Sequence, residues 1–193
     1  MKDTQINGTL RSEVGQKFAK ETRKQGLIPC VLYGGKENFH FTVEPLEVRD
    51  IIYTSEFKVI NLKLGSTAHR AIVKAIQWHP VKDTLQHLDF LELQPDKKFK
   101  VQIPLKFTGT SVGVKQGGKL IQTVRKVDIK TDMKGLVDTL FVDISHLDLG
   151  QAVRIRDIKV PSNIEVLNNP SLPIGYIDIP RALKSAASAA AKG

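Results

Sequence analysis

The chain has 193 residues, a formal net charge of +9 and one cysteine. A lone cysteine excludes an internal disulfide and a paired-thiol metal site, and such usage indicates a protein of a reducing compartment. The first 30 residues lack the apolar core of a signal peptide, and no later stretch approaches the roughly 18 apolar residues of a membrane span. We therefore expect a cytoplasmic protein without a membrane partner.

The positive charge is unevenly distributed along the chain. Residues 1–94 hold 13 Lys/Arg against 11 Asp/Glu, a net of +2, whereas residues 95–193 hold 16 against 9, a net of +7. Within the first part, residues 1–36 form a local basic stretch, with 7 Lys/Arg against 3 Asp/Glu. This excess favours a polyanionic partner, such as a nucleic acid, without identifying it.

The first predicted element is a helix at 16–25, "QKFAKETRKQ". It offers little apolar surface, and Lys17, Lys20 and Lys24 recur on one face with Arg23 beside them. Such a run is either an ordinary solvated helix face or a phosphate-binding face, and the sequence leaves both interpretations open.

The next segment is "LIPCVLYGGK" at 27–36, a short apolar strand that ends in a tyrosine, two glycines and a lysine. It could be a phosphate loop, a nucleophile site or a turn that presents side chains to a partner. A phosphate loop needs a second, spaced glycine upstream, and the segment has none. The apolar neighbours of Cys30 indicate a small buried residue rather than a nucleophile.

Alternation with a period of two predicts half-buried strands in the following part. It occurs at 39–43 and 60–64, and the second run turns at Gly65-Ser66 into 70–78, which predicts a hairpin. A second short helix is predicted at about 45–53, beginning with a proline. Helices are therefore expected to be the minority.

The segment "QWHPVKDTLQHLDFLEL" at 77–93 has the most specific polar pattern. In a strand over 85–91, Leu88 and Phe90 point to the core, and His87 and Asp89 point away from it, about 7 Å apart. That outer face is either an ordinary solvated surface or a surface that recognises RNA. A carboxylate and an imidazole can accept hydrogen bonds from guanine amino groups and 2′-hydroxyls in the RNA minor groove.

After a linker at 93–98, short β-rich runs predict a second, all-β domain. The runs lie at 99–107, 120–129, 140–144 and 152–160. The stretch "GVKQGGKL" has P-loop spacing, but Leu120 replaces the Ser/Thr and a strand follows where the motif requires a helix, so we interpret it as a turn. The final residues, 181–193, are rich in Ala and Lys and predict a flexible tail.

No catalytic or metal-binding pattern is visible in the sequence. The histidines at 69, 79 and 87 are ten and eight residues apart, with no acidic or thiol ligand at a recognised interval. H-E-x-x-H is missing from the sequence. We expect no enzyme, no cofactor and no metal.

Two of these segments resemble the hallmarks of one family. "GLIPCVLYGGK" and "WHPVKDTLQHLDF" are similar to motifs of the bacterial large-subunit ribosomal protein twenty-five family, which binds 5S ribosomal RNA. "GVKQGGKL" and "FVDISHLDLGQAVRIRDIKVP" are similar to the second domain of its two-domain form, known as CTC or general stress protein. The resemblance covers about 1–180. Around Gly15 and Lys17 the chain departs from the family's usual Gly-Lys-Gly pattern.

The resemblance implies a mainly β protein. We expect a six-stranded β-barrel with small helices at 1–94, similar to the anticodon-binding barrels of glutaminyl-tRNA synthetase, then a β-rich domain at 95–180. The implied function is a structural constituent of the large ribosomal subunit that binds the minor-groove side of loop E of 5S RNA in the central protuberance. Other large-subunit RNA or proteins are implied partners of the second domain, and the free protein is expected to be a monomer.

The RNA-binding candidates come from the two motifs and the predicted helix. They are Arg11, Lys17, Lys20, Arg23, Tyr33, Gly34, Gly35, Lys36, Gln77, His79, His87 and Asp89. On this interpretation Tyr33 ends a strand at the RNA surface, the two glycines let the backbone approach the RNA, and Lys36 contacts a phosphate. The alternatives are an RNA-binding stress factor that acts mainly off the ribosome, and an enzyme that uses Cys30 or the histidines.

Overall fold

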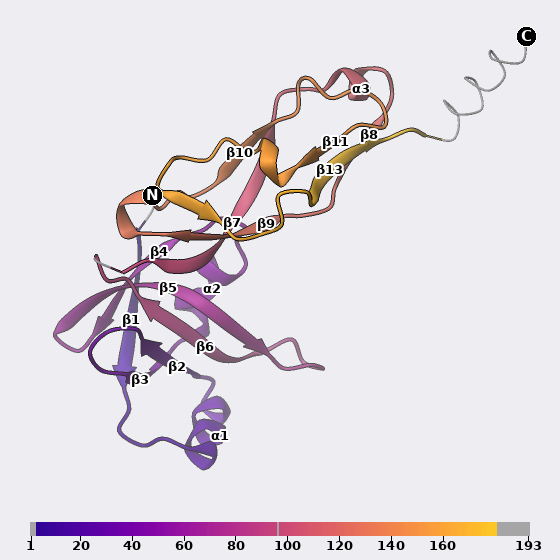
Figure 1. Ribbon diagram of the computed structural model, residues 1–193. Coiled ribbons are helices and arrows are strands. Elements are labelled where there is room, and N and C mark those ends of the chain that lie inside the picture. Colours follow the sequence, from indigo (N-terminus) through magenta and orange to yellow (C-terminus); the bar gives the residue numbers. More distant parts are fainter. Residues whose placement is uncertain (1–2, 96, 181–193) are drawn as a thin grey trace, which may run out of the picture. The chain divides into compact units, whose positions relative to one another are not determined.

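The computed structural model describes residues 3–95 and 97–180 (Figure 1). The predicted flexible tail at 181–193 lies outside the described residues. The described chain divides into two compact units, one running up to Val101 and including Asp132–Asp138, the other formed by Gln102–Thr131 and the residues from Thr139 onward. The predicted boundary between residues 94 and 95 lies a few residues before this division and stays a prediction.

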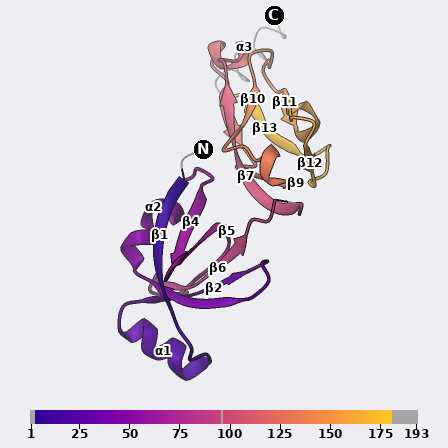
Figure 2. The ribbon, with the colours of Figure 1, turned by 90° about the vertical axis from the view of Figure 1, so that its left-hand side faces the viewer.

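The first unit is built on a closed barrel of six strands. These are β1 (Asp3–Leu10), β2 (Ile28–Tyr33), β3 (Phe39–Val43), β4 (Val59–Leu64), β5 (Thr67–Trp78) and β6 (Leu85–Glu92). Their order around the barrel is β1-β3-β2-β6-β5-β4. The parallel pairing of β1 with β4 closes the barrel, and β2 lies beside β6 in a second parallel pair (Figure 2).

The barrel interior follows from the two-residue alternation of its strands. Phe41 and Phe90 are fully buried at its centre, and their rings are 5.5 Å apart and inclined at 45°. The aliphatic side chains packed in the same core include Ile6, Leu32, Ile60, Leu62 and Leu88. Because one face of each strand is committed to this core, the other face is available for polar residues.

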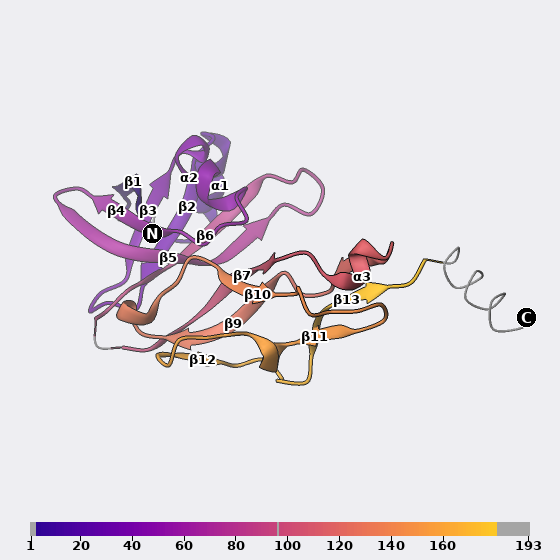
Figure 3. The same ribbon diagram turned by 90° about the horizontal axis from the view of Figure 1, so that it is seen from above.

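Two short helices accompany the barrel. Helix α1 (Gln16–Lys24) has no buried residue, and helix α2 (Pro45–Ile52) buries Val48. Pro45 occupies the first turn of α2, as the sequence predicts, because its missing N–H has no helical acceptor there. The long β5–β6 hairpin projects beyond the barrel at its tip (Figures 1 and 3).

The second unit consists of two small sheets, and β7 leads into it from the first unit. One has the order β10-β7-β9-β12 and the other β11-β13-β8. The strands are β7 (Phe99–Thr108), β8 (Lys119–Gln122), β9 (Lys126–Thr131), β10 (Leu140–Asp143), β11 (Ala152–Arg154), β12 (Ile164–Val166) and β13 (Pro173–Asp178). Its short helical turns are α3 (Val112–Lys115) and η2 (Ile155–Asp157), whereas η1 (Met133–Gly135) lies in the segment that belongs to the first unit.

The predicted fold class is confirmed: the chain is mostly β, with an N-terminal six-stranded barrel and a second β-rich part. Two of the predicted runs are wrong in detail. The run 120–129 is two strands, β8 and β9, which belong to different sheets, and the run 152–160 is a strand only as far as Arg154, where η2 takes over. None of the described helices is long and apolar enough to span a membrane.

Candidate nucleic-acid interface

Four of the predicted RNA-binding residues lie on the outside of adjacent barrel strands. We call Tyr33, Gln77, His87 and Asp89 the strand face. Gln77 of β5 is the register partner of His87 on β6, and on the other side of β6 the partner of Asp89 is Val31, two residues before Tyr33. Three strands thus bring together residues that are far apart in the sequence.

The alternation predicted for β6 is confirmed. Leu88 and Phe90 are fully buried, whereas His87 and Asp89 keep 22% and 28% of their side chains exposed. Nδ1 of His87 lies 2.7 Å from Oδ1 of Asp89, yet this nitrogen is buried and makes no contact with hydrogen-bond geometry. The pair leaves donor and acceptor capacity for an incoming group.

Arg11 adjoins the strand face from the end of β1. Its backbone N–H donates to the carbonyl of His40 on β3 at 3.0 Å. Its guanidinium is partly buried, and Nε and Nη1 have no hydrogen-bond partner. A buried charged donor without an acceptor is costly, so the free protein holds the Arg11 guanidinium there at the expense of stability.

Tyr33 presents its phenol beside this cluster. Partial burial, and then the negative charge of Asp89, raises the pKa of Tyr33 above its ordinary value. The hydroxyl therefore remains protonated at neutral pH and can donate a hydrogen bond.

Gly34 and Gly35 have an internal reason to be glycine. Gly34 has φ +98°, and a Cβ there would lie 2.7 Å from Cδ1 of Leu91. A Cβ on Gly35 would collide with the carboxylate of Glu92. The Tyr33–Lys36 loop therefore packs closely on the end of β6, and its close approach to RNA stays a prediction.

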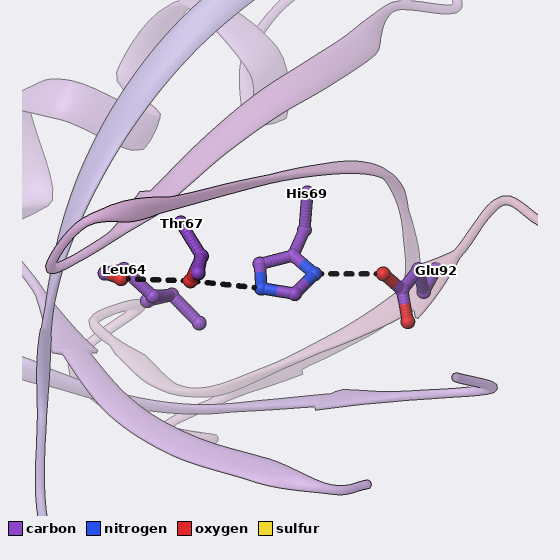
Figure 4. A network of polar contacts seen from close by, with 4 residues as sticks. All are labelled: Leu64, Thr67, His69 and Glu92. Carbon is purple, nitrogen blue, oxygen red and sulfur yellow. Dashed lines mark hydrogen bonds and ion pairs between the residues drawn. The ribbon is translucent and has the colours of Figure 1, made fainter. Parts of the chain in front are cut away.

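The carboxylate that faces this loop is itself held in place (Figure 4). Oε1 of Glu92 lies 2.7 Å from Nδ1 of His69, and Nε2 of His69 lies 3.2 Å from Oγ1 of Thr67. Thr67 in turn donates to the carbonyl of Leu64 at 3.0 Å. The loop therefore rests on an ordered network, while the exposed Lys36 is free to extend outward.

We predict that Gly34→Ala destabilises the protein by about 2–4 kcal/mol, because an unfavourable φ adds to a contact that the side chain of Leu91 must move to relieve. Urea unfolding of the whole chain measures the effect. The matched control is Gly65→Ala, where φ is +60° but nothing lies within 4 Å, and a smaller loss of about 1–2 kcal/mol is expected. Equal losses would show that the contact with Leu91 does not matter.

A second group of candidates surrounds an open groove of about 800 Å³ between α1, α2 and the β5–β6 tip. Lys20, Arg23 and His79 line it. Nε of Arg23 donates to the carbonyl of Gln86 at 3.0 Å, which fixes α1 to β6 and leaves the rest of the guanidinium for a ligand. Lys17 is exposed on the same helix but does not line the groove.

His79 orders the tip of the hairpin. The backbone N–H groups of Val81 and Lys82 both donate to its Nδ1 at 3.2 Å. The ring can therefore offer only Nε2–H to a partner, as a donor. The strand register is irregular between Gln77 and Trp78, just before this turn, and such an irregularity changes the direction in which the end of β5 runs.

The sites considered for a nucleophile, a phosphate loop or a metal ion are poorly suited to these roles. Cys30 is fully buried, and burial raises the pKa of its thiol well above the ordinary value, so the nucleophilic thiolate does not form at neutral pH. The glycines of "GVKQGGKL" pack within the turn between α3 and strand β8, where Gly118 donates to the carbonyl of Gly113 at 2.8 Å. Among residues 3–95 and 97–180, no cluster of three potential metal ligands occurs.

The sequence interpretation missed part of the groove. Tyr53, Lys24 and Lys82 also line it, but they come from three separate segments. Lys24 was visible as a member of the basic helix face. The other two carry no local signal, because only the tertiary structure brings the end of α2 next to the hairpin tip.

Comparison with known proteins matches both parts of the chain. Residues 6–90 match the Ribosomal L25p family, and residues 98–181 match the C-terminal domain of ribosomal protein TL5. The large ribosomal subunit protein bL25 of Cytophaga hutchinsonii is 42% identical over 192 residues, covering all of both chains. The proteins of the same name from Amoebophilus asiaticus and Bacteroides fragilis are each 36% identical, over the whole of this chain and at least 98% of theirs.

Proposed function

The chain belongs to the ribosomal L25p family, and on that premise we propose that it is a constituent of the large ribosomal subunit that binds 5S ribosomal RNA. One observation carries the RNA-binding part of the proposal. Two buried side-chain nitrogens of Arg11, Nε and Nη1, lack a hydrogen-bond partner within the described residues, and Arg11 adjoins the strand face. Buried polar groups are almost always paired in a working protein, so these donors point to a partner that supplies acceptors.

The chemistry of the strand face suits the minor-groove side of an RNA helix. Arg11 and Tyr33 offer donors, and the carboxylate of Asp89 offers acceptors for guanine amino groups or 2′-hydroxyls. A carboxylate beside an arginine fits base reading better than pure phosphate binding, because phosphates would repel it. We propose the distorted loop-E helix of 5S RNA, in the central protuberance, as the target.

The lysines have a different proposed role. Lys20, on helix α1, and Lys36, in the Tyr33–Lys36 loop, are both exposed. As mobile point charges they suit phosphate contacts, which position a protein on RNA without reading its sequence. Lys17 and Arg23 extend the same basic surface.

We propose that RNA recognition resides in residues 1–94 and that residues 95–180, with the larger share of positive charge, contact other large-subunit RNA or proteins.

We predict that a 1–94 fragment binds 5S RNA within about threefold of the whole chain, because the strand face and the groove lie inside it. Fluorescence anisotropy with labelled 5S RNA measures both. Recovery of the affinity by the 95–193 fragment alone would overturn this assignment.

The alternative is an RNA-binding stress factor that acts mainly off the ribosome, and no catalytic role is proposed for either. Sedimentation distinguishes the two. A ribosomal constituent migrates with the large subunit in a lysate fractionated at moderate salt. A protein that remains at the top of the gradient, as a free monomer, would favour the stress factor.

A further inference from the structure

The groove beside α1 has features that the strand face does not need. Its basic rim carries Lys20, Arg23, Lys24 and Lys82, against one carboxylate, Asp83. Its floor is apolar, formed by the segment from Gly26 to Ile28. A basic rim over an apolar floor complements a ligand with anionic and flat apolar parts together.

The size of the groove limits the ligand. A volume of about 800 Å³ lies in the range of pockets that hold a compact ligand. One or two nucleotides are of this size. An RNA helix can lie across the rim, but only an unpaired nucleotide can enter.

The groove also has an aromatic side chain in its lining. Tyr53, the residue after α2, lines the groove with 66% of its surface exposed. Its ring is held from the side by Trp78, in a T-shaped contact with the centroids 5.8 Å apart. Its backbone N–H donates to the carbonyl of Arg49 at 3.1 Å. A tyrosine that is both exposed and held in place is a stacking platform with little conformational entropy left to lose.

We propose that this groove binds an unpaired RNA nucleotide, whose base stacks on Tyr53 and whose phosphates contact Lys20, Lys24 and Lys82. The proposal rests on the proposed RNA-binding function and specifies it: the strand face reads a helix, and the groove captures a nucleotide extruded from it or adjacent to it. Arg23 holds the wall formed by α1 in place through its bond to β6.

The test uses the chain's single tryptophan as a reporter, because Trp78 contacts Tyr53 directly. The full-length protein is titrated with single-stranded tetra-adenylate, and tryptophan fluorescence is recorded. Saturable quenching is expected. Tyr53→Leu should weaken binding about 5- to 150-fold, as for the loss of one stacked base, while Tyr53→Phe should bind like wild type. The matched control is Tyr176→Leu, a partly exposed tyrosine of the other unit, which should change nothing.

Three results would overturn the proposal: no saturable quenching, equal binding by Tyr53→Leu, or an equal response to tetraglutamate, which would make the groove a site for acidic peptides. The same proteins are also titrated with 5S RNA. Wild-type binding to 5S RNA without any groove response would refute the groove alone. Failure of the wild type to bind 5S RNA would refute the proposed function itself.

Discussion

Replacing Arg11 with methionine is expected to weaken 5S RNA binding about 10- to 200-fold without destabilising the free protein. Methionine keeps most of the side-chain volume but removes the guanidinium, whose Nε and Nη1 are buried without partners. In the free protein this removal relieves a desolvation cost, so stability should stay unchanged or rise by about 1 kcal/mol. In the complex it removes one or two charge-assisted hydrogen bonds.

Two measurements together check this expectation: urea unfolding of the free protein and anisotropy with 5S RNA. Arg49→Met is the matched control, because Arg49 is exposed on α2 and lies outside the strand face. Its effect on RNA affinity should be small. If Arg11→Met instead lowers the free energy of unfolding by several kcal/mol, Arg11 stabilises the fold. Its unpaired nitrogens would then be no evidence for an RNA contact.

Asp89→Asn is expected to weaken binding to 5S RNA by about 1–3 kcal/mol, or about 5- to 150-fold, as for other specific base contacts. Asparagine has nearly the same shape, but it loses half of the acceptor capacity and adds a donor near Nδ1 of His87. On a plain RNA duplex the same change should be neutral or slightly favourable, because it removes a charge that repels phosphates.

The check is a paired titration of wild type and Asp89→Asn against 5S RNA and against a duplex of equal length, at one salt concentration. Asp50→Asn removes an exposed carboxylate from α2 and serves as the control for net charge. An equal loss on both RNAs would mean that Asp89 only supports the barrel. Unchanged binding to 5S RNA would mean that the outer side of β6 is an ordinary solvated surface.

The parts predicted correctly from the sequence are those that local periodicity determines. The alternation around Leu88 and Phe90 oriented β6, and the glycine turn at Gly65 predicted the β4–β5 hairpin, because both signals lie within a few residues. The run 120–129 was misassigned for the same reason. It has continuous β propensity, and only tertiary packing makes the chain leave one sheet and enter the other.

The parts that could not be predicted depend on long-range pairing. The end of β1 pairs with β3, and this brings Arg11 beside the strand face with two unpaired nitrogens that no sequence pattern reveals. Likewise, the register of β6 places Glu92 against Gly35, a packing contact that no local pattern reveals, and the contact of Gly35 with RNA stays a prediction. The groove needs α1, α2 and the hairpin tip together.

The most direct test of 5S RNA recognition is a titration of the wild-type chain against two RNAs at the same salt concentration. One is 5S RNA, and the other is 5S RNA in which loop E is replaced by Watson–Crick pairs. Recognition of loop E by the strand face predicts that the replacement weakens binding by about 100-fold or more, since specific contacts are lost and phosphate contacts remain. Equal affinity for the two RNAs would show that the protein binds 5S RNA only as a polyanion, and would contradict the account.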